Sequence, residues 1–266
     1  MPSLGDIENT ILMMLSEPGA NFVLGQGPSW SSLTNPQYSQ ALLDYFINLG
    51  YKRVASDLAD YNLLAAEFTI TTSTGVGTYP IPPMQPANPF PEIRLLRDVF
   101  YLPLGVQNAV RFEPGSMLVS WSEFCRKTGQ NYLRANSGTL YPTYCALGPQ
   151  RDTLELFPTP LETGDIITVY YSALPTPNAN QFPTLVTVTD MIALPSDCAE
   201  AITYWALWYV YKRNGDDANA KFYRQTYAEE IARLKVIYGR DSIGDFLQIT
   251  GEPTYSPVND LSWAGL

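Results

Sequence analysis

The clearest hydrophobic pattern in the chain runs from Leu194 to Tyr238 and predicts two consecutive helices. Pro195 ends the extended run before it, Ser196 is a residue type that caps helices, and Asp197 places a carboxylate at the positive end of a helix dipole. From residue 201 to residue 211 every side chain but one is apolar or aromatic. A helix that is apolar on all sides is expected to be buried by its neighbours. The first helix is therefore predicted to be the centre of a helical unit.

The second helix of this pair is predicted to be amphipathic. Asn214-Gly215 ends the first helix, and Asp216-Asp217 begins the next. The apolar residues that follow recur at steps of three and four and form one face. We expect the two helices to form an αα-hairpin with one buried and one half-buried member. The predicted core residues of the resulting bundle are Ile202, Trp205, Trp208, Tyr223, Tyr227, Ile231 and Leu234.

Residues 1–66 carry further helical patterns. The segment Asp6–Leu15 has apolar residues along one side, and Asn35-Pro36 combines a capping residue type with proline at the first helical position. An apolar stripe then continues to Gly50, which predicts a break, and a third helix is expected from Val54 to Leu64. The Gly-, Ser- and Pro-rich segment between the first two helices predicts an extended arm or loop.

From residue 67 to about residue 189 the pattern changes to that of β-strands. Short runs rich in β-branched and aromatic residues alternate with turns such as Pro103-Leu104-Gly105 and Glu113-Pro114-Gly115. This alternation predicts a small antiparallel β domain with one short helix near Val119–Arg126. The expected strands are Phe68–Thr72, Ile93–Leu102, Val110–Phe112, Thr143–Leu147, Thr153–Phe157 and Ile166–Tyr171.

Residues 239–266 have a third composition, in which Gly, Pro and Ser surround isolated large apolar side chains. Such a segment is too sparse in apolar groups to form a core of its own, so it is predicted to be extended and to become ordered on a partner chain. Aromatic anchors of this kind often dominate the energy of an interface. The alternative is that the first two anchors cap the helices of their own chain. The predicted partner-binding residues are Phe246, Leu247, Tyr255, Leu261 and Trp263.

The composition of the 266-residue chain narrows the classes of function. A net charge of -10 argues against a surface that binds nucleic-acid phosphates. No apolar run approaches the roughly 20 residues of a membrane span, and the N-terminus lacks the pattern of a signal peptide, so synthesis in the cytoplasm is expected. Cys125, Cys145 and Cys198 are widely spaced and odd in number, which predicts reduced thiols.

The search for catalytic patterns favours a protein without an active site. The chain contains no histidine, which excludes Ser-His-Asp and Cys-His catalysis and imidazole metal ligands. Gly25-Gln26-Gly27 and Gly75-Val76-Gly77 lack the third glycine of a dinucleotide-binding loop, and no phosphate-binding loop with lysine occurs. Paired carboxylates could still hydrolyse a glycoside, and tyrosines could stack on sugars, but tyrosine is also favoured in protein interfaces. We therefore expect no cofactor, no metal and no catalytic residue.

The order of these motifs resembles that of head-to-tail adaptor proteins of tailed bacteriophages. Phe68–Thr72 and Gly77–Pro82 are similar to the strand, turn and Tyr-x-x-Pro opening of that family. Leu154–Pro160 and Asp165–Tyr171, followed by the two C-terminal helices, are similar to its second half. The resemblance covers roughly residues 37–238 and rests on the order and spacing of ordinary motifs.

The resemblance implies a structural role in the virion. Adaptors of this kind form a ring, commonly twelve-fold, beneath the portal protein, extend the DNA channel and present a docking surface to a tail or nozzle protein. It implies a homo-oligomer in the head-tail neck that DNA traverses without specific binding, with a C-terminal segment that contacts the portal or a neighbouring copy. The alternatives are a glycan-binding or depolymerising tail component and a different tail-completion protein.

The expected fold class is α+β, a helical bundle with an inserted small antiparallel β domain and an extended C-terminal tail. The roles of residues 18–34 and 83–91 stay open. The expected divisions of the chain are residues 1–66 for the N-terminal helices, 67–189 for the β domain, 190–238 for the helical hairpin and 239–266 for the partner-binding tail.

Overall fold

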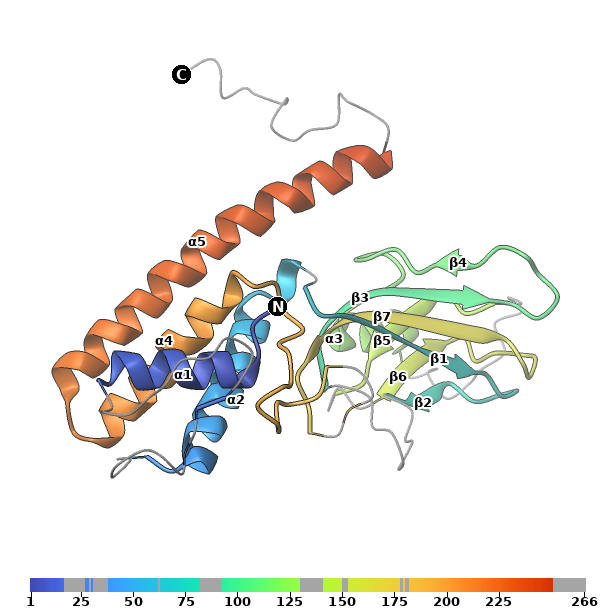
Figure 1. Ribbon diagram of the computed structural model, residues 1–266. Helices are drawn as coiled ribbons and strands as arrows, with labels where there is room; N and C mark the ends of the chain where they lie inside the picture. Colours follow the sequence, from blue (N-terminus) through green and yellow to red (C-terminus); the bar gives the residue numbers. More distant parts are fainter. Residues whose placement is uncertain are drawn as a thin grey trace, which may run out of the picture. The chain divides into compact units, whose positions relative to one another are not determined.

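A computed structural model of the chain shows two compact units, Met1–Leu63 with Leu185–Leu266 and Leu64–Thr184, here called the helical unit and the β unit (Figure 1). Helices and strands together give the mixed α+β class that the sequence predicts. The structure describes residues 1–16, 27–28, 30, 38–61, 63–81, 92–129, 141–149, 153–177, 179 and 182–250, with side chains up to residue 239.

The helical unit is held by helices whose ends follow from local sequence. Ser3 caps the first helix, because its hydroxyl accepts a hydrogen bond from the Asp6 amide while the Asp6 carboxylate accepts one from the Ser3 amide. Gly215, at a φ of 74°, separates the last two helices, and Asp216 accepts a hydrogen bond from the Asn219 amide at the start of the second. The elements of this unit are α1 (Leu4–Met14), α2 (Gln40–Asp57), the 3-10 turn η2 (Ala59–Tyr61), α4 (Cys198–Arg213) and α5 (Asp217–Thr250).

Three expectations about these helices are wrong. Gly50 does not break a helix, since α2 runs through it as one helix to Asp57. Helix α4 begins without a side-chain cap, although Ser196 and Asp197 precede it. Helix α5 does not end at Tyr238 but continues to Thr250, because the single Gly239 costs a helix only about 1 kcal/mol and no proline follows within the next turns. Residues 251–266 lie outside the described part of the chain.

Gly50 lets two helices approach closely. A Cβ atom at this position would lie 2.9 Å from the main-chain oxygen of Ile202 in α4 and 3.3 Å from the Trp205 ring. A main-chain oxygen within a helix cannot move aside as a flexible side chain can. The glycine that looked like a helix break is therefore a packing position.

Substituting Gly50 with alanine is expected to lower the free energy of unfolding by about 1–3 kcal/mol, because overpacking outweighs the gain in helix propensity. Gly239→Ala is the matched control, since a Cβ there meets only a Tyr61 carbon at 3.5 Å. That control should be neutral or stabilise by up to about 1 kcal/mol. Urea unfolding of both variants measures the difference, and equal stabilities would contradict the close approach of α2 and α4.

Hydrogen bonds connect the segment before α4 to both N-terminal helices, α1 and α2. The Asn48 side chain in α2 donates to the Leu185 carbonyl and accepts from the Leu185 amide, both at 2.8 Å. The Ala193 amide donates to the Tyr51 hydroxyl at 3.1 Å, and the Leu4 amide of α1 donates to the Asp190 carbonyl at 2.8 Å. These bonds connect the two sequence segments of the helical unit, which are more than 100 residues apart.

The β unit contains two antiparallel sheets and one short helix, α3 (Trp121–Thr128). In the larger sheet, with the order β1-β7-β3-β4, β7 pairs with β1 and β3 on its two sides. The smaller sheet has the order β2-β6-β5. The strands are β1 (Ala65–Thr71), β2 (Thr78–Pro80), β3 (Glu92–Leu102), β4 (Val110–Arg111), β5 (Tyr144–Leu147), β6 (Thr153–Phe157) and β7 (Ile166–Leu174).

Tyr79, the tyrosine of the Tyr-x-x-Pro motif, closes the turn between β1 and β2. Its ring is 6% exposed, its hydroxyl donates to the Val76 carbonyl at 2.8 Å, and the Ser73 amide donates to that hydroxyl at 3.2 Å. The motif that suggested the adaptor resemblance thus has a structural role in this chain.

Tyr79→Phe should lower the free energy of unfolding by about 1 kcal/mol, because it removes these bonds and keeps the ring. Tyr141→Phe serves as the control, since that ring is 43% exposed, and it should stay within about 0.5 kcal/mol of the parent. Thermal unfolding of both variants gives the comparison. Equal melting of Tyr79→Phe and the parent would show that the turn does not depend on this hydroxyl.

Candidate interaction surfaces

Helix α4 presents a half-buried aromatic face, not the all-round burial that the sequence suggested. Its small and aliphatic side, including Ile202, Ala206 and Leu207, is fully buried. The outer parts of its large rings extend past the neighbouring helices, so burial on all sides is wrong. The half-buried aromatic residues of α4 are Tyr204, Trp205, Trp208, Tyr209 and Tyr211.

The aromatic face continues onto α2 and α5. The Trp205 ring centroid lies 4.7 Å from that of Trp208 and 4.7 Å from that of Tyr227 in α5. Phe46 of α2 stacks on Tyr209 with centroids 5.6 Å apart and an interplanar angle of 15°. Such ring pairs add about 0.5–1.5 kcal/mol beyond their burial.

A polar network lies beside these rings. The Tyr227 hydroxyl donates to the Asp57 carboxylate of α2 at 2.7 Å, and Arg53 Nε donates to the same carboxylate at 3.0 Å. The Arg53 guanidinium also lies over the Trp205 ring, 5.3 Å from its centroid. Burial and the adjacent Asp57 carboxylate raise the pKa of Tyr227, so the tyrosine is the hydrogen-bond donor in this network.

A groove of about 710 Å³ opens between α2, α4 and α5, with these aromatic and charged side chains in its walls. Two further cations flank Trp208: Lys212 lies 5.1 Å and Arg224 5.7 Å from its ring centroid. We call this feature the cationic groove. Its lining residues are Arg53, Asp57, Trp205, Trp208, Lys221, Arg224, Gln225, Tyr227, Ala228 and Ile231.

The predicted core residues differ in burial, and four of the seven, Trp205, Trp208, Tyr227 and Ile231, line this groove. Ile202, Tyr227, Ile231 and Leu234 are buried, whereas Trp205, Trp208 and Tyr223 are half-buried. Sequence reasoning missed the cations that line the groove, because Arg53 lies in α2 whereas Lys221 and Arg224 lie in α5, far later in the chain.

The predicted C-terminal anchors mostly lie beyond what the structure describes. Phe246 and Leu247 belong to the last turns of α5, for which only the backbone is described. Tyr255, Leu261 and Trp263 lie outside the described residues, as do residues 18–26, 31–34 and 83–91, whose roles the sequence left open.

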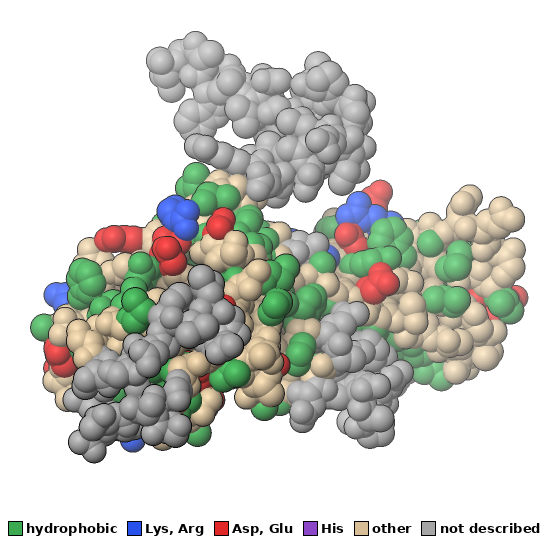
Figure 2. Space-filling view, viewed as in Figure 1, with side chains coloured by type: hydrophobic (Ala, Val, Ile, Leu, Met, Phe, Trp, Pro, Cys, Tyr) green, Lys and Arg blue, Asp and Glu red, His purple; other side chains and the backbone are tan. Residues whose placement is uncertain are grey.

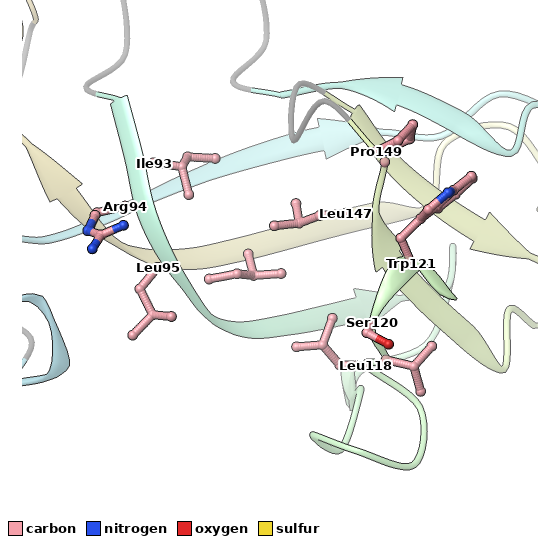
Figure 3. Close-up of a pocket in the computed structure, with 11 residues that line it drawn as sticks. Ile93, Arg94, Leu95, Leu118, Ser120, Trp121, Leu147 and Pro149 are labelled. Atoms are coloured by element: carbon pink, nitrogen blue, oxygen red, sulfur yellow. The ribbon is translucent and has the colours of Figure 1, made fainter. Parts of the chain in front are cut away.

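The β unit carries a second hollow, an apolar cleft of about 530 Å³ beside β3. Two register irregularities in β3, between Ile93 and Leu95 and between Leu96 and Asp98, break its alternation at the cleft wall. Ile93 and Leu147 point into the cleft, and Arg94 points away from it on the other side of β3 (Figure 3). The residues lining the cleft are Ile93, Arg94, Leu95, Leu96, Leu118, Val119, Ser120, Trp121, Leu147, Gly148 and Pro149.

Trp121 is the one tryptophan of the β unit, and it bears on the glycan-binding alternative. Its ring stacks on buried Phe124, with centroids 5.7 Å apart and an interplanar angle of 18°. Among the described residues that line the cleft there is no Asp or Glu. This described lining suits apolar side chains and includes no carboxylate pair of the kind that glycoside hydrolysis uses.

The three cysteines of the chain are free thiols. Cys145 and Cys198 are fully buried, and burial raises the pKa of the Cys198 thiol to about 12, so it stays protonated and unreactive at neutral pH. Cys125 is exposed. Within the described segments, no group of three or more Cys, Asp or Glu side chains is arranged to hold a metal ion.

A buried carboxyl pair joins α1 to α2. Glu8 in α1 is fully buried and lies within hydrogen-bonding reach of Asp44 in α2, and Gln40 Nε2 donates to Glu8 Oε1 at 3.5 Å. Burial first, and then the Asp44 carboxyl, raise the pKa of Glu8 from 4.5 to about 9; burial also raises the pKa of Asp44. The raised pKa favours a protonated Glu8 carboxyl at neutral pH, and such a carboxyl can donate a hydrogen bond to Asp44.

One member of this pair has a recognisable signal in the sequence. Glu8 follows Leu4 by four residues and precedes Ile11 and Leu12 by three and four, so it falls on the apolar face of α1. A charged residue on such a face is expected to be either paired or neutral.

The visible face of the described residues carries extensive hydrophobic surface with only small groups of Lys, Arg, Asp and Glu (Figure 2). Among the described residues, no helix is both long enough and apolar enough to span a membrane. Exposed aromatic and aliphatic side chains, such as Tyr45 at 58% and Phe222 at 61%, are suited to contacts between proteins. These surfaces are suited to a protein that acts through contacts with other proteins.

Comparison with protein families agrees with this class. The family model described as SU10 adaptor protein matches residues 24–246, which is most of the chain. The protein belongs to the SU10 adaptor protein family, a family of phage head-to-tail adaptors. The resemblance inferred from motif order is confirmed. No curated protein matches the chain.

Proposed function

We propose that this protein is a structural component of the virion that joins the head to the tail. Copies of the chain form a ring, commonly twelve-fold in adaptors of this kind, beneath the portal protein. The ring extends the DNA channel and offers a docking surface to a tail or nozzle protein. The observation that carries the proposal is the adaptor family match over residues 24–246.

The two units suit different contacts in such a ring. The helical unit carries the half-buried aromatic face and the cationic groove, which are suited to contacts between copies or with the portal. The β unit carries an apolar cleft that is suited to side chains of a further partner. The C-terminal part of the chain, from Gly239 onward, supplies anchors for the portal or a neighbouring copy. We propose these parts as the assembly domains of the protein.

The net charge of -10 supports a channel that DNA passes without specific binding. Like charges oppose adsorption of the phosphate backbone, so an acidic ring favours passage. The protein is then made in the bacterial host cytoplasm and acts in the neck of the virion.

A catalytic role has less support. The chain has no histidine, and the described lining of the cleft in the β unit includes no carboxylate. That described lining therefore offers no acid pair for depolymerisation. A different tail-completion protein shares the assembly role but is disfavoured by the adaptor family match.

Phage particles made without this protein should contain packaged DNA but leak it or fail to acquire tails. Electron microscopy and infectivity of particles from a deletion strain, with plasmid-supplied protein as the control, measure this outcome. Tailed and infectious particles from the deletion strain would contradict the proposal.

A further inference from the structure

The cationic groove is a local exception in an acidic protein. Although the chain carries a net charge of -10, three cations, Arg53, Lys221 and Arg224, line the groove against the single carboxylate of Asp57. The Arg53 side chain remains 51% exposed even though it pairs with Asp57. The groove therefore favours a ligand that brings negative charge.

The groove also offers aromatic surface. Trp205 and Trp208 are half-buried and line it, with cations over their rings from α2, α4 and α5. Half-exposed tryptophans beside arginine are a typical composition for the centre of a protein interface. A ligand with apolar anchors and acidic groups would match both properties.

Residues 251–266 have this composition. They contain Tyr255, Leu261 and Trp263 as large apolar groups, Glu252 and Asp260 as charges, and neither Lys nor Arg. Asp260 stands three residues before Trp263, so an acidic group and an aromatic anchor are close together in the sequence. The acidic and aromatic side chains of residues 251–266 are thus complementary to the cations and tryptophan rings of the cationic groove.

The segment is long enough to reach such a groove. Nineteen helical residues separate Ile231, a lining residue on α5, from the end of α5 at Thr250, a span of about 28 Å. Thirteen extended residues from Thr250 to Trp263 span up to about 45 Å. Trp263 can therefore lie in a groove well removed from its own helix end.

We propose that residues 251–266 of one copy bind in the cationic groove of a neighbouring copy, with Trp263 against Trp208 and Asp260 beside Arg224. This inference rests on the proposed ring, which places identical subunits side by side, and names the contact that connects them. Each subunit then supplies one groove and one C-terminal segment, a head-to-tail arrangement that closes when the ring is complete.

A labelled peptide of residues 251–266 tests the contact outside the virion. The acceptor is the full chain with Trp263→Ala, so that its own segment does not compete, and fluorescence anisotropy reports binding. Arg224→Glu in the acceptor should weaken binding about tenfold, and Asp260→Lys in the peptide should restore it. Lys235→Glu, an exposed position on the same helix outside the groove, should leave binding unchanged. Absence of peptide binding, or an Arg224→Glu acceptor that binds normally, overturns the assignment, as does failure of the charge exchange to restore binding.

A photocrosslinking amino acid in place of Trp263 distinguishes a neighbouring copy from the same chain. Irradiation of the purified full-length protein should give a ladder of linked copies on a denaturing gel, with crosslinks to α4 or α5. Crosslinks only within single chains would show that the segment returns to its own groove and would overturn the proposal. Neither experiment uses a virion, so loss of the adaptor function and loss of this contact are separate outcomes.

Discussion

The parent protein should lose stability as the pH rises from about 5.5 to 8.5, and replacing Glu8 by glutamine should abolish this loss. Glu8 is fully buried beside Asp44, and its pKa is raised from 4.5 to about 9. The unfolded chain releases the Glu8 proton near pH 4.5, whereas the folded chain keeps it until about pH 9. Between these values the folded state binds more protons, so stability is greatest at low pH and falls as the pH rises.

The slope is at most about 1.4 kcal/mol per pH unit for one retained proton. The background is favourable for this measurement, because the chain has no histidine to titrate between pH 5 and 8. In the variant, the amide of glutamine still donates to Asp44 and does not titrate. The Glu8→Gln protein should therefore be more stable than the parent at pH 8.5.

Urea unfolding followed by circular dichroism at several pH values gives both slopes. Glu155→Gln is the matched control, since Glu155 is also buried but accepts hydrogen bonds from Thr78 and Thr153. That variant should retain the slope of the parent. Equal pH profiles for the parent and the Glu8→Gln protein would contradict a raised pKa of Glu8 in the folded protein.

Trp205→Ala should lower the free energy of unfolding by about 3 kcal/mol, at the lower end of the range for truncation of a large aromatic residue. Trp205 lies between α2 and α5, where it contacts Tyr227 and lies under the Arg53 guanidinium. Truncation removes both contacts and leaves a space beside Gly50. The half-burial of the ring keeps the effect below that for a fully buried tryptophan.

Trp208→Ala is the comparison, because Trp208 has the same residue type and helix but points toward Lys212 and Arg224 on the outer side. It should cost clearly less than Trp205→Ala in the free energy of unfolding. Thermal and urea unfolding of the two variants measure this difference in the free energy of unfolding. A Trp205→Ala protein that melts like the parent would mean that this ring does not hold α2, α4 and α5 together.

The sequence predicted those features that depend on neighbours along the chain. Strand β6 lies at Thr153–Phe157 as expected, and the turn at Gly215 separates α4 from α5, because alternation and turn residues act locally. The predictions that were wrong concern features that depend on tertiary contacts. Gly50 was interpreted as a break because a glycine within a helix and a glycine at its end look alike until the neighbouring helix is known.

The candidate site was predictable only in part. The aromatic residues of α4 were recognised as important, but their half-burial depends on the distance to α2 and α5. The cationic groove combines Arg53 of α2 with Lys221 and Arg224, which are neighbours on α5, and no sequence pattern connects the two helices. Of the pair of Glu8 and Asp44, only Glu8 could be recognised from the sequence, because its position on an apolar helix face is a local feature. That Asp44 is its partner depends on how α1 packs against α2.

The most direct test of the adaptor assignment is an electron microscopic image of purified portal protein mixed with this chain. The proposed adaptor ring should appear as added density, coaxial with the portal, that lengthens its channel. The portal alone provides the control image. A portal that gains no ring, or density bound away from the channel axis, would contradict the assignment.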